Sequence, residues 1–81
     1  MAIDFEKLLK NIIVPLILHP ENLEIVNKVN VNEITINLLL DKEDVGRVIG
    51  RNGKTANSIR NILYAAATLD KKRIHLDINS K

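Results

Sequence analysis

The residue types best suited to binding phosphate gather in residues 48–59, which read VIGRNGKTANSI. The stretch contains Gly-Lys-Thr, the ending of the commonest nucleotide-binding signature. A phosphate-cradling P-loop needs G-x-x-x-x-G-K-[ST], because its backbone amides must wrap one phosphate in a concave turn. If Gly53 is the second glycine, the first should stand at position 48, which is Val48. The spacing therefore argues against a nucleoside-triphosphate pocket.

The same glycines suit a different phosphate ligand, the extended backbone of a polynucleotide. Gly50 and Gly53 flank Arg51 and Asn52, and neither glycine carries a Cβ that would keep a ligand away from the main chain. The loop leads into the start of a predicted helix, where free amides and the helix dipole favour a phosphate group. Lys54 adds a mobile cation beside these fixed donors.

The charges are distributed unevenly along the chain. The net charge is +2, yet residues 1–44 hold eight acids and four bases, whereas residues 45–69 hold four bases and no acid. A basic zone of this kind around the glycine loop indicates a polyanionic partner. A further basic run at residues 71–73 is more typical of a solvated face than of a second binding site. The four bases of the zone are Arg47, Arg51, Lys54 and Arg60.

Length and composition limit the possible classes of protein. The 81 residues suffice for one small domain, and the absence of cysteine excludes disulfides and thiolate metal sites. No apolar run approaches the roughly 20 residues that a membrane span needs, so we expect a cytoplasmic protein. His19 and His75 have no partners at metal-ligand spacing, and Ser58 has no histidine at a catalytic spacing. The sequence predicts no metal, no cofactor and no enzymatic activity.

Hydrophobic periodicity predicts the elements before the loop. Apolar residues at helical spacing between residues 5 and 16 predict an amphipathic helix, with Asp4 as its N-cap and Pro15 as its end or kink. Residues 23–29 and 34–40 are rich in β-branched side chains and predict an antiparallel hairpin.

The elements around and after the loop follow from caps and glycines. Asp41 is the expected N-cap of a short helix that Gly50 ends. A longer helix should run from the residue after Gly53 to about Leu69. Residues 73–78, RIHLDI, alternate in polarity and predict a final strand.

Residues 45–63, VGRVIGRNGKTANSIRNIL, resemble the core of a KH domain, whose GxxG loop joins two helices and clamps four nucleotides of single-stranded nucleic acid. The element order is similar to the type II arrangement found in bacteria. The whole chain resembles the KhpA family of stand-alone bacterial KH proteins, including HPE after the first helix and RIHLDI at the end.

This resemblance implies a fold of the α+β class with a single type II KH domain over residues 1–81. The implied order is α-β-β-α-GxxG-α-β, with a three-stranded sheet packed on helices. Residues 1–22 would form the N-terminal helix and turn, and residues 23–81 the KH core with its GxxG loop at residues 50–53.

The resemblance also assigns roles around the loop. Arg51 and Asn52 should face the phosphates, and Val45 and Ile49 should line an apolar floor for the bases, with Gly46 allowing close packing beneath it. With only Phe5 and Tyr64 as aromatic residues, RNA recognition cannot depend on stacking. The predicted RNA-binding residues are Val45, Gly46, Arg47, Ile49, Gly50, Arg51, Asn52, Gly53, Lys54 and Thr55.

As a function, the resemblance implies a non-enzymatic single-stranded RNA-binding protein. It further implies an RNA chaperone or post-transcriptional regulator that acts with a KhpB-type partner in cell elongation and envelope homeostasis. Two alternatives stay open. The chain could be a protein-interaction module with a vestigial loop, or a ribosome-associated assembly factor.

A second apolar stripe on the long helix is either a surface for self-association or extra burial within one chain. It lies about 100° round the helix from the expected core face, where a monomer normally places polar groups. A homodimer, or a heterodimer with a KhpB-type protein, would align two weak binding loops on one strand. The stripe consists of Ile62, Ala65 and Leu69.

Overall fold

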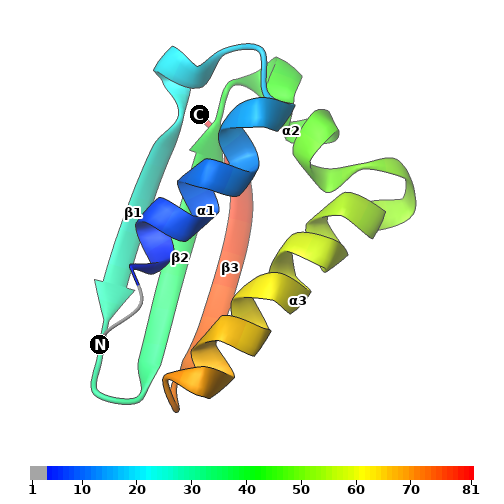
Figure 1. Ribbon diagram of the computed structural model, residues 1–81. Helices are drawn as coiled ribbons and strands as arrows, with labels where there is room; N and C mark the ends of the chain where they lie inside the picture. Colours follow the sequence, from blue (N-terminus) through cyan, green and yellow to red (C-terminus); the bar gives the residue numbers. More distant parts are fainter. Residues whose placement is uncertain (1–3) are drawn as a thin grey trace.

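A three-stranded sheet forms one layer of the molecule and the helices pack against it (Figure 1). The computed structural model describes residues 4–81, so the first three residues of the predicted domain lie outside the described part. The elements are α1 (Phe5–Ile13), β1 (Glu24–Val29), β2 (Glu33–Leu40), α2 (Lys42–Ile49), α3 (Lys54–Leu69) and β3 (Arg73–Ser80), with short 3-10 turns η1 (Val14–Leu16), η2 (Pro20–Asn22) and η3 (Arg51–Gly53).

The predicted helix boundaries are confirmed, and their caps are present. The Asp4 side chain accepts a hydrogen bond from the Lys7 amide at 3.0 Å, which satisfies one of the unpaired donors at the start of α1. The α-helix ends at Ile13, just before the 3-10 turn that contains Pro15. Asp41 caps α2 in the same way, accepting from the Glu43 amide at 2.9 Å.

The strand order in the sheet is β1-β2-β3. β1 pairs antiparallel with β2, as the hairpin prediction required, whereas β3 pairs parallel with β2. A parallel pair needs a crossover connection, because the chain must return to the end of the sheet from which the first strand started. Here α2, the glycine loop and α3 together supply that crossover.

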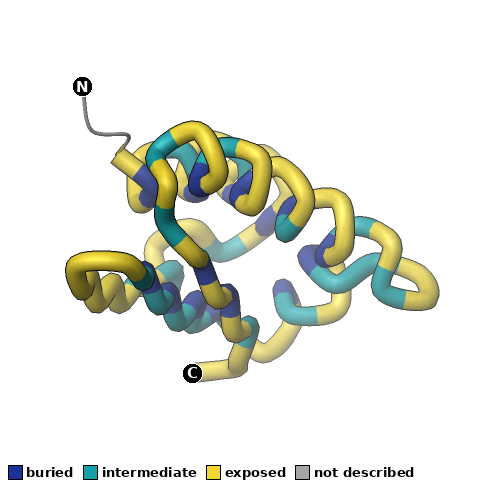
Figure 2. Tube along the Cα trace, turned by 90° about the horizontal axis from the view of Figure 1, so that it is seen from below, coloured by how far each residue is buried: buried dark blue, intermediate teal, exposed yellow. Residues whose placement is uncertain are grey.

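Alternate residues of the strands fill the space between sheet and helices. In β2 every second side chain is buried and those between are half-buried, whereas in the first half of β3 buried side chains alternate with exposed ones. Viewed from below, the buried positions lie where the helices and the sheet face each other (Figure 2). The strand members of this core are Ile34, Ile36, Leu38, Leu40, Ile74 and Leu76, and its helical members include Leu9, Ile13, Val48, Ile59 and Leu63.

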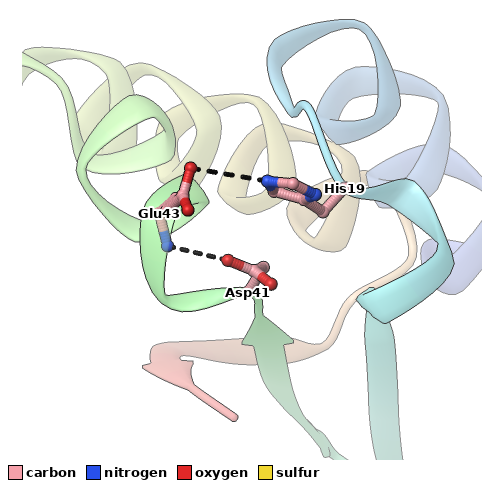
Figure 3. A group of neighbouring side chains, drawn as sticks. All are labelled: His19, Asp41 and Glu43. Atoms are coloured by element: carbon pink, nitrogen blue, oxygen red, sulfur yellow. Dashed lines mark hydrogen bonds and ion pairs between the residues drawn. The ribbon is translucent and has the colours of Figure 1, made fainter.

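The connector between α1 and β1 meets the start of α2 through His19, Asp41 and Glu43 (Figure 3). Partial burial lowers the pKa of His19, but its contact with Glu43 and the charges of Asp41 and Asp44 outweigh that effect and raise the pKa above its ordinary value. The backbone N–H of Glu43, helped by the Asn22 amide and by His19, holds the pKa of Asp41 below its ordinary value despite partial burial. Both directions are those expected where an imidazole lies among carboxylates.

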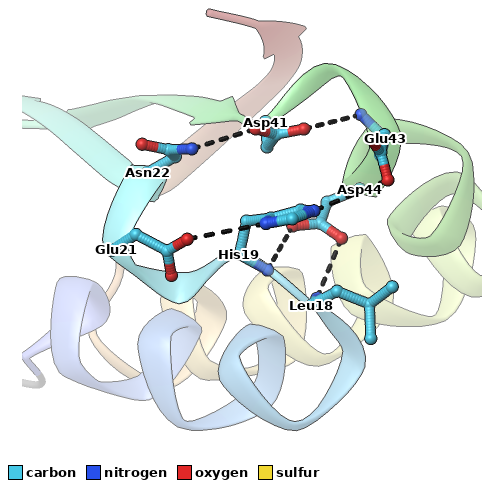
Figure 4. Close-up of polar contacts among 7 residues, drawn as sticks. All are labelled: Leu18, His19, Glu21, Asn22, Asp41, Glu43 and Asp44. Carbon is cyan, nitrogen blue, oxygen red and sulfur yellow. Dashed lines mark hydrogen bonds and ion pairs between the residues drawn. The ribbon is translucent and has the colours of Figure 1, made fainter.

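Asp44 is the fully buried charged residue of this junction, and its burial and its bonds to the connector were not predicted from the sequence. Its two carboxylate oxygens accept hydrogen bonds from the backbone N–H groups of Leu18 and His19, each at 2.9 Å (Figure 4). The charge also lies in the first turn of α2, where the helix dipole stabilises an anion. Asp44 therefore fastens the connector to the helix that leads into the glycine loop.

Replacing Asp44 with asparagine should lower the free energy of unfolding by about 2–4 kcal/mol, because the substitution removes the charge and turns an NH₂ group toward a backbone donor. Chemical denaturation measures the loss. The matched control is Asp77→Asn, since Asp77 is exposed on β3 and makes no hydrogen bond or ion pair within residues 4–81. That control should change stability by no more than about 0.5 kcal/mol. Equal effects of the two variants would contradict the assigned role.

Candidate nucleic-acid interface

The glycine loop has a backbone conformation that ordinary residues avoid. Gly50 has φ 76° and ψ 175°, a region that only glycine adopts readily. Gly53 is left-handed, with φ 75° and ψ 11°, and Asn52 is also left-handed, with φ 57° and ψ 25°. Asparagine tolerates this conformation better than most residues. The two glycines are therefore required by the turn itself, whatever the loop binds.

Gly50 is required for a second reason, which is contact with Thr55. A Cβ atom at Gly50 would overlap Thr55 Oγ1 and lie only 2.7 Å from Thr55 Cβ. Thr55 stands in the first turn of α3, so its side chain supports the loop from within the protein. Thr55 is one of the predicted RNA-binding residues, and this packing role was not predicted. The only feature of the sequence that could have indicated this packing is the short spacing between Gly50 and Thr55.

Gly53 and Gly46 face open space instead. A Cβ atom at either position would meet nothing within 4 Å. The expectation that Gly46 allows close packing within the protein is therefore wrong. Its bare backbone faces outward on α2, between the half-buried Val45 and Ile49. Val45 and Ile49 are four residues apart, so they lie on one apolar face of α2, and Val45 also packs in part against the hydrophobic core.

The main chain of the loop offers free hydrogen-bond donors. The Gly50 N–H donates to Gly46 O at 2.9 Å and ends α2, and the Gly53 N–H donates to Gly50 O at 3.2 Å. Within the described range, the N–H groups of Arg51 and Asn52 have no backbone or side-chain acceptor. These two amides lie at the start of η3, which runs into the N-terminus of α3, where the helix dipole adds to their positive charge.

The basic residues divide into free and engaged side chains. Arg47, Arg51 and Lys54 are exposed, and none of them pairs with a carboxylate among residues 4–81. Arg60 is half-buried, and its Nη2 donates to the carbonyl oxygen of Leu76 at 3.4 Å. Arg60 therefore links α3 to β3 and is not a free cation of the loop.

The basic run at residues 71–73 lies at the far end of α3 from the loop. The 16 residues of α3 separate the two by roughly 24 Å. One of its lysines, Lys72, faces Asp70 at 3.6 Å. The structure thus does not bring this run to the candidate interface.

All ten predicted RNA-binding residues fall in one continuous segment, from the second half of α2 through η3 to the first turn of α3. In Figure 1 the loop between α2 and α3 projects from the side of the molecule, away from the sheet. The site therefore combines a half-buried apolar strip, two free amides and three cations that have no partner among residues 4–81. That each of these residues contacts RNA remains a prediction.

A GxxG turn between two helices, set beside a three-stranded sheet in this order, defines the class of KH domains. The sequence model of the KhpA/KhpB KH domain matches residues 6–78, and the chain belongs to this family. The predicted family and α+β fold are therefore confirmed.

Curated relatives carry the name RNA-binding protein KhpA. The chain is 40% identical over 73 residues to that of Listeria monocytogenes, a match that covers 90% of this chain and 96% of the relative. It is 40% identical over 76 residues to the Streptococcus pneumoniae protein, covering 94% of this chain and 95% of the relative. For Bacillus subtilis the identity is 33% over 73 residues, or 90% of each chain. No solved structure gives a significant match.

Among residues 4–81, no helix has both the length and the apolar character to cross a membrane.

Gly50→Ala should destabilise the protein more than Gly53→Ala, although both glycines have positive φ. At Gly53 the cost should be about 1–2 kcal/mol, which is the cost of left-handed backbone for an L-residue. At Gly50 the added Cβ also overlaps the Thr55 side chain. Urea denaturation of the two variants measures the difference. Equal losses of stability would show that Thr55 does not constrain the loop.

Proposed function

We propose that the protein binds single-stranded RNA without enzymatic activity, through the face made by α2, the glycine loop and the start of α3. The observation that carries the proposal is the pair of free amides at Arg51 and Asn52, placed among three cations that have no partner in the described chain. The names of the relatives, which are called RNA-binding proteins, support it.

In this proposal the backbone of the nucleic acid is held and the bases are read only weakly. A phosphate is bound by the two amides at the positive end of α3, and the side chains of Arg47, Arg51 and Lys54 neutralise adjacent phosphates. If each cation neutralises one phosphate, the logarithm of affinity falls by roughly 2 for a tenfold increase in salt.

The bases would lie on the apolar strip of Val45 and Ile49. Neither aromatic residue can stack on them at this face, because Phe5 is buried in the core and Tyr64 lies well along α3 from the loop. Affinity for a single loop should accordingly be modest, since stacking contributes much of the energy in other single-strand readers.

Changing Arg51 and Asn52 together to aspartate should abolish RNA binding and leave the fold intact, because both side chains are exposed and the new carboxylates repel phosphate. Fluorescence polarisation with an unpaired oligoribonucleotide measures binding, and circular dichroism checks the fold.

The control for this experiment carries the same change of charge elsewhere. Lys71→Asp with Asn30→Asp places two aspartates at exposed turn positions beyond the far end of α3. This variant should retain most of the RNA binding. Equal loss in both variants would mean that overall charge, and not the loop, governs binding, whereas no loss in either would favour the vestigial loop.

We also propose that the protein self-associates through the second stripe of α3. Ile62 is 48% exposed and Leu69 is 82% exposed, and Ala65 between them is exposed as well. Burial within one chain, the alternative left open by the sequence, is therefore wrong. An exposed apolar stripe of this kind favours a partner surface, and a dimer would place two loops on one RNA strand.

Ile62→Asp should convert a dimer into a monomer without changing the circular dichroism spectrum, because the side chain is exposed in the single chain and a buried charge would oppose association. Sedimentation velocity measures the oligomeric state. Val26→Asp is the matched control, since Val26 is a partly exposed apolar residue on β1 and not on α3. A wild-type protein that is monomeric at micromolar concentration would contradict the proposal.

The wider role that we propose depends on membership of the KhpA/KhpB family. It is that of a cytoplasmic RNA chaperone or post-transcriptional regulator, with a KhpB-type protein as partner, in cell elongation and envelope homeostasis. An RNA-binding face of modest affinity fits such a role, because a second RNA-binding chain would add avidity.

A further inference from the structure

The junction between the α1–β1 connector and α2 places an imidazole among carboxylates at the surface. His19 comes from the connector, and Asp41 and Glu43 come from the start of α2 (Figure 3). One possible ligand atom from each of the three residues lies within 4.8 Å of the other two. His19 Nε2 is 3.5 Å from Glu43 Oε2.

We propose that His19, Asp41 and Glu43 bind a divalent transition-metal ion of the zinc type, which joins the connector to α2. The sequence predicted no metal site because His19 stands far from both carboxylates along the chain. Only the fold brings the three side chains together.

The donor set suits zinc, and the three ligand atoms lie close enough together to approach one ion. An imidazole nitrogen and two carboxylate oxygens can occupy three positions of a tetrahedral ion, and water takes the fourth. With metal–ligand bonds of about 2.0–2.1 Å, two tetrahedral ligand atoms lie about 3.3 Å apart. The separation of 3.5 Å between His19 Nε2 and Glu43 Oε2 is close to this value. Asp41, which is also the N-cap of α2, supplies the third ligand.

Neighbouring groups orient two of the three ligands, His19 and Asp41. Glu21 lies 3.5 Å from His19 Nδ1, on the opposite side of the ring from Glu43 (Figure 4). A carboxylate on the far nitrogen is the usual way to orient a metal-binding histidine and increase its basicity. Asp41 accepts from Asn22 Nδ2 and from the Glu43 amide, each at 2.9 Å. Each of its oxygens keeps a further lone pair for a metal.

The local charge favours a cation. Besides the two ligand carboxylates, Glu21 and the buried Asp44 lie in the same group of polar contacts (Figure 4). Within residues 4–81, none of these four carboxylates is paired with a lysine or an arginine. Asp44 already binds two backbone amides and is fully buried, so it supplies charge and not a ligand.

A metal ion at this site would stabilise the fold and would not contact the RNA. It lies at the N-terminal end of α2, and the loop lies at the other end of this eight-residue helix, roughly 12 Å away. A bound ion would join the same two segments that Asp44 joins. We therefore expect zinc to stabilise the fold by mass action, since it binds the folded chain and not the unfolded one.

Titration of zinc into the full chain tests the proposal by calorimetry, with the imidazole ¹⁵N resonances of both histidines followed by NMR. We expect one zinc per chain, a shift of the His19 resonances and a higher melting temperature. His19→Gln and Glu43→Gln should each weaken zinc binding by about tenfold or more. Both variants keep the backbone bonds to Asp44, and circular dichroism checks that they fold.

The matched control is His75→Gln, because His75 is the only other histidine of the chain and lies exposed on β3. Zinc binding in this variant should equal that of the wild type. The proposal is overturned if the wild type shows no saturable binding, or if His75→Gln weakens binding as much as His19→Gln. Zinc-induced dimers with half an ion per chain would also overturn it.

Discussion

The parallel pairing of β2 with β3 is the constraint on which the rest of the structure depends. After β2 the chain must cross to the other end of the sheet before β3 can begin, and the crossover consists of α2, the glycine loop and α3. Both helices bury apolar side chains in the core, among them Val48 and Leu63. Both ends of the loop are therefore fixed by helices that pack in the core. The glycines can reverse the chain direction while the flanking helices stay in place.

The elements of the fold could be predicted because their signals are local. Asp4 and Asp41 mark the first turns of two helices, and Gly50 marks the end of one of them. The parallel partner of β2 could not be read from periodicity, which gives the face of a strand and not its neighbour. The helix-capping role of Asp41 is visible in the sequence, whereas the bonds of Asp44 to the Leu18 and His19 amides join residues that are distant in the chain.

The segment that carries the candidate site could be located for the same reason. Its residues are consecutive, so a short motif could place them together. The motif did not separate free from engaged bases, and only the tertiary contact between Arg60 and Leu76 O removes Arg60 from the free set. Nor did it assign Thr55 to the support of Gly50, or show that Gly46 faces open space. Each of these findings depends on a side chain's surroundings in three dimensions.

The close packing of the Thr55 side chain against Gly50 has a thermodynamic consequence. The turn takes its shape from backbone preference and from a side chain within the protein, so the shape exists before any ligand arrives. A preorganised loop of this kind gives up little conformational entropy on association. More of the contact energy then remains as affinity for a ligand that the loop binds.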